Sequence, residues 1–449
     1  MSNGSGSWGV TPVPERLRTL TVFDLTTLWG NLGVSLLVLV AAALLVPAMS
    51  LQQAFLAVLL GSIAGNLMLG AAGMIGADGR VPAMVLLRAP LGRRGSYAAS
   101  GLNVAQCLGW ATFEIIIIAA AASALSDRLF GVAGKELWTV VTGCVALALA
   151  LMGPIGVVRR ILRRFALPIV VGSLLYLSWW AVRDADLGAL WRAPGEGGMP
   201  FVGGVDLVIA ITVSWIPLAA DYTRFARGRR AALVGTGVGY FLAATWMLAL
   251  GCVLVLARGL ADPAELPAAV AAAGLASALA LLAVTVDEAD EAFANVYSTA
   301  ISLQNLVGRL PQRLLVALVA ALATLGALTI PLARYETFLL LLGSFFVPLF
   351  GVLLADWLLS GASYARRDFF AAPSMRPGPV AAWIAGFALY QWLHPLGPAW
   401  WTDLVARTNP PDVQIGSSLP SFALAFGLAA VAILLERRVR ARRIASAAT

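Results

Sequence analysis

The basic residues of this chain lie in the gaps between long apolar runs, and nearly all of them fall in every second gap. When twelve runs are counted from a cytoplasmic N-terminus, the inner segments carry 24 of the 31 lysines and arginines. The outer segments carry only seven: Arg128, Lys135, Arg183, Arg192, Arg258, Arg334 and Arg407. This bias is typical of a polytopic membrane protein whose basic loops face the cytoplasm. One span more or fewer would destroy the alternation, so the pattern predicts twelve spans with both termini cytoplasmic.

The composition favours the same class of protein. Of the 449 residues, 60% are hydrophobic and only 12% are charged, which does not fit a soluble domain. Each run has about 18–26 residues, enough for a helix to cross a hydrocarbon core of about 30 Å. The runs do not alternate as the strands of a membrane β-barrel do. The net charge of +8 comes mainly from the inner loops and favours lipid headgroups over nucleic acid as the partner.

The alternation defines the expected organisation of an all-α protein of the plasma (inner) membrane. We expect a cytoplasmic tail at 1–21, a first five-helix repeat at 22–183, a second at 204–359, two further helices within 380–436 and a basic cytoplasmic tail at 437–449. The N-terminus lacks the pattern of a cleaved signal, so the first helix is expected to be retained. The predicted spans are 22–46, 51–76, 96–125, 137–158, 165–183, 204–225, 231–257, 272–307, 313–331, 335–359, 380–397 and 418–436.

The sequence shows no pattern of residues that would bind a metal or a cofactor. Cys107, Cys144 and Cys252 lie in apolar spans without metal-ligand spacing, and His394 is the only histidine. No GxxxxGK[ST] motif occurs, so ATP hydrolysis by that route is not expected. We expect no cofactor, no transition metal and no enzymatic activity, because a nucleophile–base or metal constellation is missing.

Two spans contain residues that interrupt a helix. The first span has Gly30, Asn31 and Gly33 near its middle, which weaken a helix. The sixth contains Pro217 after Ser214-Trp215-Ile216, and an interior proline removes a backbone hydrogen bond. Irregular backbone at membrane depth survives only where protein or a water-lined cavity satisfies it.

The two interruptions lie five spans apart, and both spans begin with similar residues, Phe23-Asp24-Leu25 and Val205-Asp206-Leu207. An odd number of spans in each half inverts the second half in the membrane. Inverted repeats with paired broken helices are typical of secondary transporters with a site near the midplane. The alternative is that glycine and proline are simply common in membrane helices.

The third span carries a polar stripe. Asn103, Gln106, Trp110 and Glu114 share one helical face. An amide suits the edge of a heterocycle and an indole suits stacking against a ring. Glu114 would be costly if it faced lipid, so we expect it to face protein, where cation binding or proton coupling is one interpretation. The alternative is a structural stripe that packs between helices.

The eighth span contains Asp287, Glu288, Asp290 and Glu291. Of these acids, Asp287 and either Asp290 or Glu291 fall close to one face, followed by Asn295, Ser298 and Ser302. Intramembrane acids indicate cation ligands or proton carriers, and oxygen ligands suit a hard cation such as sodium. The alternative is that the acids form an outer loop and the helix begins near Ala292. Like charges would prevent all four acids from being buried and ionised together.

At the inner end of the sixth span, Asp221 and Arg224 lie one helical turn apart. A helix-end ion pair is the simpler interpretation of this spacing, and a gate is the alternative.

With these residues the chain resembles the nucleobase:cation symporter-1 family, in its purine–cytosine permease branch. The resemblance covers roughly residues 22–440. It rests on five pieces: Trp29-Gly30-Asn31, Gly92-Arg93-Arg94-Gly95-Ser96, Gln106 with Gly109-Trp110, Ala220-Asp221-Tyr222-Thr223-Arg224-Phe225, and Ala294-Asn295.

The resemblance implies a leucine-transporter-like fold with five plus five core helices, broken helices one and six, and two further helices. It implies that Trp110 stacks on one face of a planar substrate and Trp215 covers the other, with Thr212 or Ser214 as alternatives to Trp215. Gln106 and Asn295 would bind the ring edge, and Trp29 and Asn31 would line the site beside the first break.

The family's sodium lies between the break in helix one, here near Gly30 and Gly33, and hydroxyl groups of helix eight. Ala289, Asp290 and Glu291 stand where those hydroxyls are expected, so either Na⁺ or H⁺ remains open as the coupling ion. We predict a cation symporter, functional as a monomer, that imports a nucleobase such as cytosine or a purine. The alternatives are a hydroxymethylpyrimidine, hydantoin or allantoin transporter, an amino-acid transporter of the same fold, and an ion channel.

Overall fold

The computed structural model describes residues 11–152, 156–183, 185–260, 265–306, 310–409 and 415–447, and their regular elements are helices. The long helices are α3 (Leu51–Gly79), α6 (Gly95–Phe130), α7 (Lys135–Met152), α8 (Gly156–Arg183), α12 (Arg229–Arg258), α14 (Leu275–Leu306), α15 (Gln312–Thr329), α16 (Tyr335–Leu359), α18 (Pro377–Leu393) and α20 (Ser418–Ala447). The shorter ones are η1 (Glu15–Leu17), α1 (Val22–Leu32), α2 (Leu36–Ala41), η2 (Ala42–Leu44), α4 (Ala83–Leu86), α5 (Arg88–Leu91), α9 (Leu187–Arg192), α10 (Phe201–Val213), α11 (Ile216–Thr223), α13 (Leu266–Ala272), η4 (Leu332–Arg334), α17 (Arg366–Phe370) and α19 (Ala399–Ala406).

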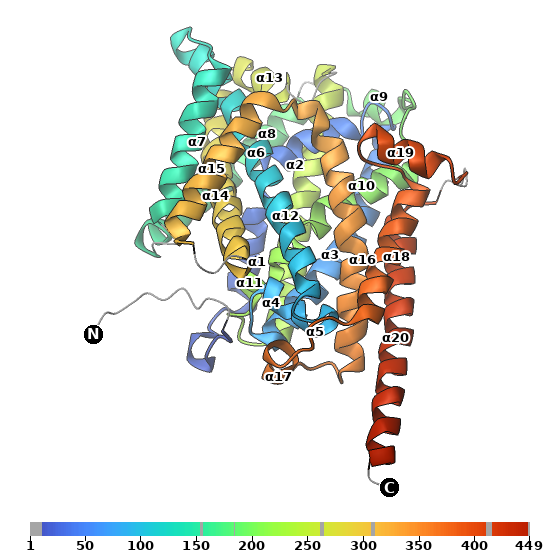
Figure 1. The fold of residues 1–449 in the computed structure, drawn as a ribbon. Helices are drawn as coiled ribbons and strands as arrows, with labels where there is room; N and C mark the ends of the chain where they lie inside the picture. The colour runs from blue at the N-terminus through green and yellow to red at the C-terminus, as the bar shows by residue number, and fades with distance from the viewer. Residues whose placement is uncertain are drawn as a thin grey trace.

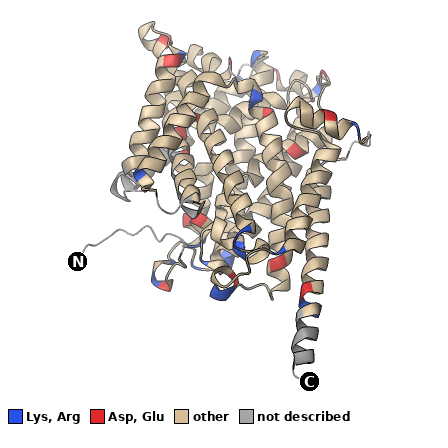
Figure 2. Ribbon diagram, in the orientation of Figure 1, with Lys and Arg blue, Asp and Glu red and all other residues tan. Residues whose placement is uncertain are grey.

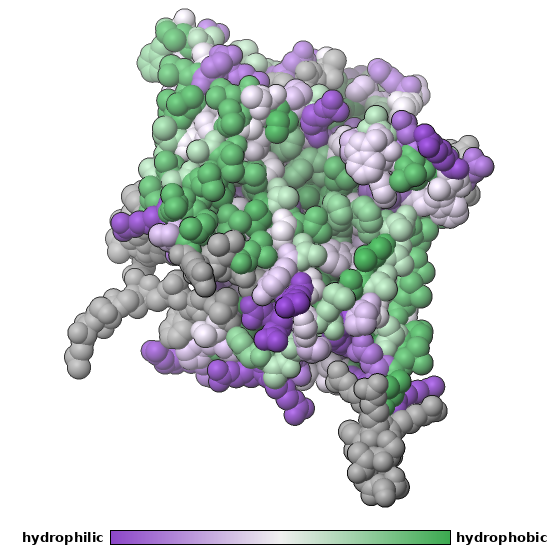
Figure 3. All heavy atoms as spheres, viewed as in Figure 1, coloured by the Kyte–Doolittle hydropathy of each residue, from purple (hydrophilic) through white to green (hydrophobic). Residues whose placement is uncertain are grey.

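The long helices run between two opposite faces of the molecule (Figure 1). Charged side chains gather toward these faces and leave a largely uncharged zone between them (Figure 2). The surface of that zone is predominantly apolar (Figure 3). Within the described chain, seven helices are long and apolar enough to cross a membrane, and the bent pair formed by α1 and α2 with η2 is an eighth candidate. An apolar girdle between two polar faces is the surface expected of an integral membrane protein.

Two helical segments end in the interior of the molecule. Helix α1 ends at Leu32 and α2 begins at Leu36, with the two segments bent by 58°. Helix α10 ends at Val213, and α11 begins at Ile216 with Pro217 in its first turn, where a proline costs no internal hydrogen bond. Both interruptions leave backbone groups that need partners from elsewhere in the chain.

Helix α14 is continuous from Leu275 to Leu306, so the acids at 287–291 lie inside a helix. The alternative that the helix begins near Ala292 is therefore wrong. That alternative assumed that four acids within five residues form a loop. Tertiary contacts, described below, instead place two of these acids in the protein interior.

Glycines allow each interrupted helix to lie close against a long helix. A Cβ atom on Gly61 or Gly65 of α3 would lie within 3 Å of Val208 or Thr212 of α10. A Cβ on Gly239 of α12 would lie 2.5 Å from the backbone oxygen of Thr26 in α1. Small residues let helix backbones approach in this way. Helices α1, α3, α10, α11 and α12 thus form one closely packed group.

The helices α6, α7, α14 and α15 form a second packed group, in which α6 makes its most extensive contacts with α14 and α15 packs on both α6 and α7. Helices α18 and α20 pack on each other and on α16 at the edge of the molecule (Figure 1). The first interrupted helix approaches the second group through α2, which contacts both α6 and α14. The candidate site lies where the two groups meet.

The glycine packing yields a stability prediction. We expect Gly239→Ala to lower the thermal unfolding midpoint of the detergent-solubilised protein, because overpacking a tight contact costs about 1–3 kcal/mol. Gly101→Ala on α6 is the matched control, since a Cβ there meets nothing within 4 Å. That control should be neutral or stabilising, because alanine favours a helix by about 1 kcal/mol over glycine. Equal midpoints for the two variants would contradict the packing described here.

Candidate substrate and cation site

A glutamate from α14 caps the interrupted first span. Ser35 is the N-cap residue of α2, and its hydroxyl donates a hydrogen bond to Glu288 Oε1 at 2.9 Å. The backbone N–H of Leu36 donates to Glu288 Oε2 at 2.6 Å. Glu288 is fully buried. A carboxylate at the first turn of α2 satisfies an otherwise unpaired N–H and is stabilised by the helix dipole.

A glutamine from α6 reaches the second interruption. Gln106 Nε2 donates to the backbone oxygen of Ser214, between α10 and α11, at 3.0 Å. The same nitrogen donates to Asn103 Oδ1 at 2.9 Å, and Asn103 Nδ2 donates to Ser302 Oγ of α14 at 2.8 Å. Gln106 therefore links α6 to the irregular backbone that the sequence analysis placed at Ser214 and Trp215.

A third polar contact joins α6 to α14. Asn295 Nδ2 donates to Glu114 Oε1 at 2.7 Å and to the backbone oxygen of Glu291 at 3.3 Å. Glu114, Asn295 and the side chain of Glu291 are all buried. The oxygens Gln106 Oε1 and Glu114 Oε2 have no hydrogen-bond partner in the described chain. The stripe on α6 thus retains two buried oxygens with unused hydrogen-bonding capacity.

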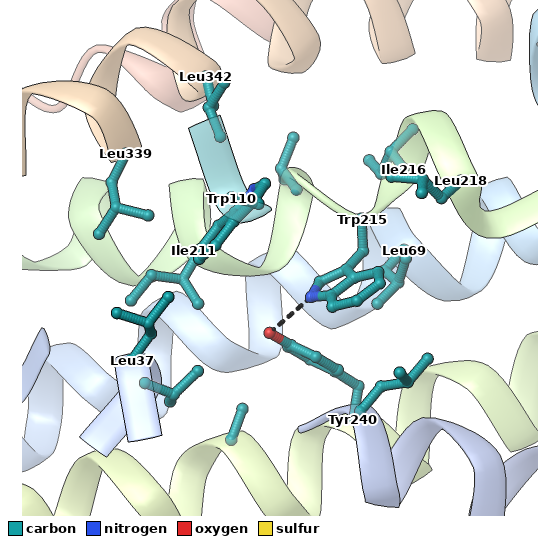
Figure 4. Packing of buried hydrophobic residues seen from close by; sticks show 14 of the residues in the cluster. Leu37, Leu69, Trp110, Ile211, Trp215, Ile216, Leu218, Tyr240, Leu339 and Leu342 are labelled. Atoms are coloured by element: carbon teal, nitrogen blue, oxygen red, sulfur yellow. Dashed lines mark hydrogen bonds between the residues drawn. The ribbon is translucent and has the colours of Figure 1, made fainter. Parts of the chain in front are cut away.

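Aromatic rings surround these polar groups in two sets. Trp110 lies edge-on to Tyr335 and Phe338 of α16, with ring centroids 5.9 Å and 5.5 Å apart. Trp215 Nε1 donates to the hydroxyl of Tyr240 on α12 at 3.0 Å, and both residues lie in one buried cluster with Trp110 (Figure 4). The indole of Trp110 therefore lies on the α6 side of the site and that of Trp215 on the α12 side.

The residues at the break between α1 and α2 contact the site mainly through apolar packing. Trp29 is fully buried and lies edge-on to Trp215, with ring centroids 5.9 Å apart. Gly33 packs against α12, where an added Cβ would lie 2.8 Å from that of Ala243. Gly30 and Asn31 are half-buried at the end of α1. The structure brings Trp29 and Trp215 together, and their part in a binding site stays a prediction.

The remaining predicted residues belong to α14 and to the C-terminal end of α11. Asp287 is half-buried, Glu291 is buried, and the side chain of Asp290 lies outside the described residues. In the last turn of α11, Asp221 Oδ1 accepts a hydrogen bond from the backbone N–H of Ala83 at 3.0 Å. Arg224 Nε donates to the backbone oxygen of Asp221 at 3.2 Å.

Sequence reasoning missed Glu288, because the helical face chosen for α14 ran through Asp287 and Asn295. The signal that could have identified it is Ser35, a good N-cap residue placed just after the glycine-rich break. An N-cap residue inside a membrane span predicts that a second helix begins there, and the first backbone N–H groups of that helix need an acceptor. Tyr240 and Tyr335 were also missed, since aromatic residues in apolar spans give no indication of which face they occupy.

Comparison with known sequences shows the family of this chain, and comparison with solved structures shows its fold. A family model described as a permease for cytosine/purines, uracil, thiamine, allantoin matches residues 12–396. The cytosine permease of Escherichia coli (strain K12) is 24% identical over 403 residues, which cover 86% of this chain and 89% of that protein.

Among solved structures, an inward-facing conformation of Mhp1 superposes with a TM-score of 0.78 at 18% identity, covering 98% of this chain and 95% of the other. A closed conformation of Mhp1, a nucleobase-cation-symport-1 family transporter with bromovinylhydantoin bound, gives 0.77 at 19% identity, with 97% and 96% covered. A manganese transporter of Eremococcus coleocola gives 0.58 at 14% identity, with 97% and 99% covered. The chain therefore has the fold of Mhp1.

The cap on α2 predicts a loss of stability when its acceptor is removed. We expect Glu288→Ala to lower the thermal unfolding midpoint, because each buried donor left without an acceptor costs about 1–3 kcal/mol. Glu196→Ala, at an exposed position, is the control and should leave the midpoint nearly unchanged. If the two variants melted together, Glu288 would not be the group that satisfies the N-terminus of α2.

Proposed function

Because the chain belongs to the family of permeases for cytosine/purines, uracil, thiamine and allantoin, we propose that it is a cation symporter that imports a nucleobase by alternating access. The observation that carries the proposal is the bond from Gln106 to the Ser214 carbonyl, one turn from Trp110. It brings an amide, an indole and an interrupted helix together in the protein interior. A small planar heterocycle needs an edge partner and a stacking surface of this kind.

The proposed architecture has twelve membrane crossings, with broken first and sixth spans. Residues 22–183 and 204–359 form two inverted five-helix repeats, and two more helices follow within 380–436. The packing of the interrupted helices supports the repeat: α1 lies on the glycines of α12, and α10 lies on those of α3. Exchanging the two halves turns one contact into the other. We place both termini, including the basic segment 437–449, on the cytoplasmic side of the plasma (inner) membrane.

Alternating access requires two bodies that move about a shared site. The group of α1, α3, α10, α11 and α12 and the group of α6, α7, α14 and α15 are the proposed bodies. Polar bonds at the site connect them, from Gln106 to Ser214 and from Glu288 to Ser35 and Leu36. Hydrogen bonds between side chain and backbone can break and reform at low cost, provided a substrate or cation replaces the lost partner.

In the proposed site Trp110 stacks on one face of the ring and Trp215 covers the other. Gln106 and Asn295 bind the ring edge, with Ser214, Trp29 and Asn31 beside them. The coupling cation, Na⁺ or H⁺, is assigned to the region between the first interruption and the acids of α14. Glu288 joins the residues expected there, because its carboxylate lies at the interruption itself. The protein is proposed to act as a monomer.

Uptake into proteoliposomes tests this function. We expect saturable uptake of labelled cytosine that requires an imposed sodium gradient or an imposed proton gradient, and the gradient that drives it identifies the coupling ion. Trp110→Ala should weaken binding, since stacking of a base on an aromatic side chain contributes about 1–3 kcal/mol. Trp400→Ala is the control, because that indole is 69% exposed.

Unlabelled adenine, hydantoin and hydroxymethylpyrimidine serve as competitors in the same assay and rank the related substrates. Flux that does not saturate would favour a channel over a carrier. No uptake and no competition by any planar heterocycle under either gradient would overturn the assigned substrate class.

A further inference from the structure

A cavity rich in arginine lies away from the proposed transport site, at the face of the molecule where α17 lies (Figure 1). Its volume is about 610 Å³, and its wall includes Arg18, Arg80, Arg227, Arg229, Arg366 and Asp78. This volume falls in the range of about 300–1,000 Å³ that is usual for pockets that bind small molecules. We infer that the cavity binds an anion that carries phosphate, either the headgroup of an anionic lipid or a soluble phosphate compound.

Segments that are far apart in the sequence meet in this wall. Arg18 precedes α1, and residues 78–80 lie at the C-terminal end of α3. Residues 227–229 lead into α12, and residues 363–366 lead into α17. Basic residues that serve only to orient a membrane protein need to lie in its inner loops and need not converge on one cavity. Their convergence here therefore indicates a binding site.

The carboxylate of the wall is already satisfied by the protein. Asp78 Oδ1 accepts from Arg229 in an ion pair. Asp78 Oδ2 accepts from Trp357 Nε1 at 3.0 Å and from the backbone N–H of Tyr364 at 2.9 Å. Asp78 thus balances the charge of Arg229 and holds the chain after α16 in place, and it leaves the other arginines of the wall without an acid.

The remaining arginines outnumber the acids beside them. Glu15 pairs with both Arg18 and Arg80, at 3.1 Å and 2.9 Å, so one carboxylate serves two guanidinium groups. Among the ion pairs of the described chain, none includes Arg227 or Arg366. The wall therefore keeps a net positive charge that described side chains do not balance.

Two of these arginines are oriented by backbone oxygens. The side chain of Arg18 is only 7% exposed, and it donates from Nε to Ala226 O at 3.1 Å and from Nη2 to Ala77 O at 3.2 Å. Arg227 Nε donates to Thr19 O at 3.0 Å. Burying a cation is costly unless it is paired, and the carboxylate of Glu15 is 67% exposed and shared. An anion in the cavity would supply the missing pairing.

The N-terminus of α12 adds to the positive potential of the cavity. Its N-cap residue, Gly228, has no side chain to cap the helix, and both Gly228 and Arg229 belong to the wall. The first N–H groups of a helix lack partners within the helix, and the N-terminus of a long helix attracts anions. These N–H groups support the assignment that the arginines carry.

Phosphate fits this arrangement better than carboxylate. A carboxylate presents two oxygens in one plane, whereas a phosphate group presents several strongly accepting oxygens in a tetrahedron and carries more charge. Guanidinium groups that come from several segments can bind different oxygens of a tetrahedral anion, each through its planar fork. A neutral heterocycle offers no such charge, so the cavity is not a second site for the proposed transport substrate.

Thermal unfolding of the purified full-length protein in neutral detergent tests the site. The probes are inorganic pyrophosphate and dihexanoylphosphatidylglycerol at constant ionic strength, with dihexanoylphosphatidylcholine as the zwitterionic control lipid. We expect at least one anionic probe to raise the unfolding midpoint, because a ligand that binds only the folded protein stabilises it. A rise with pyrophosphate alone identifies a soluble ligand, a rise with the anionic lipid alone identifies a headgroup, and a rise with both shows that the cavity accepts either source.

A paired substitution locates the binding. Arg227→Gln combined with Arg366→Gln should raise the half-saturating concentration at least about tenfold, since hydrogen bonds to charged groups are among the strongest in proteins. The matched control combines Arg94→Gln with Arg438→Gln, which removes the same charge from exposed arginines outside the wall. That control should bind as the wild type does.

A second variant tests the site even if the paired substitution prevents folding. Ser363 is exposed and belongs to the wall, so Ser363→Asp places a carboxylate in the cavity and should weaken binding by repulsion. Ser374→Asp is the control, because Ser374 is exposed and lies outside the wall.

Three results would overturn the site and leave the proposed transport function standing. The first is an unfolding midpoint that rises with neither anionic probe. The second is equal binding by the wild type and the folded cavity variants, which would place the anion elsewhere. The third is equal weakening in the cavity variants and their controls, which would reflect net charge and not this cavity.

Discussion

The structure depends on how an apolar interior satisfies the backbone of two interrupted helices. In hydrocarbon an unpaired N–H or C=O group costs several kcal/mol, so a helix can end at membrane depth only beside a specific partner. Glu288 meets this requirement at the first interruption and Gln106 at the second. Both partners come from helices outside the interrupted ones. The need to satisfy broken backbone therefore brings polar side chains of α6 and α14 to the centre of the molecule.

The same requirement links packing to the proposed transport cycle. Glycine contacts hold α1 against α12 and α10 against α3, which makes the interrupted helices part of one body. The bonds of Glu288 and Gln106 cross from α14 and α6 to the interrupted helices, within a buried apolar cluster that both groups share. Polar bonds at that position are ones that a bound substrate or cation can exchange, which is how it can shift a conformational equilibrium. Substrate and cation would act there by replacing, or adding to, partners that the protein itself supplies.

The apolar runs predicted where the long helices fall, because hydrophobicity is a property of the sequence alone. Gly33 and Pro217 predicted the positions at which helical geometry ends, since both act on the local backbone. The polar stripe through Gln106 and Glu114 was also visible as a spacing of four. Glu288 was not predicted, because its role depends on the rotation of α14 relative to α2, which is set by tertiary packing. The hydrogen bond from Asn295 to Glu114 likewise depends on how α14 packs against α6.

The central claim is that a planar ligand lies against Trp110 where the two helix groups meet. Crystals of the protein soaked with a brominated aminopyrimidine would locate the ligand directly from the anomalous scattering of bromine. We expect one bromine peak at van der Waals distance from the site residues, with the ring on the indole of Trp110. A bromine peak elsewhere, for example among the arginines of the cavity lined by Arg18, Arg227 and Arg366, would contradict it.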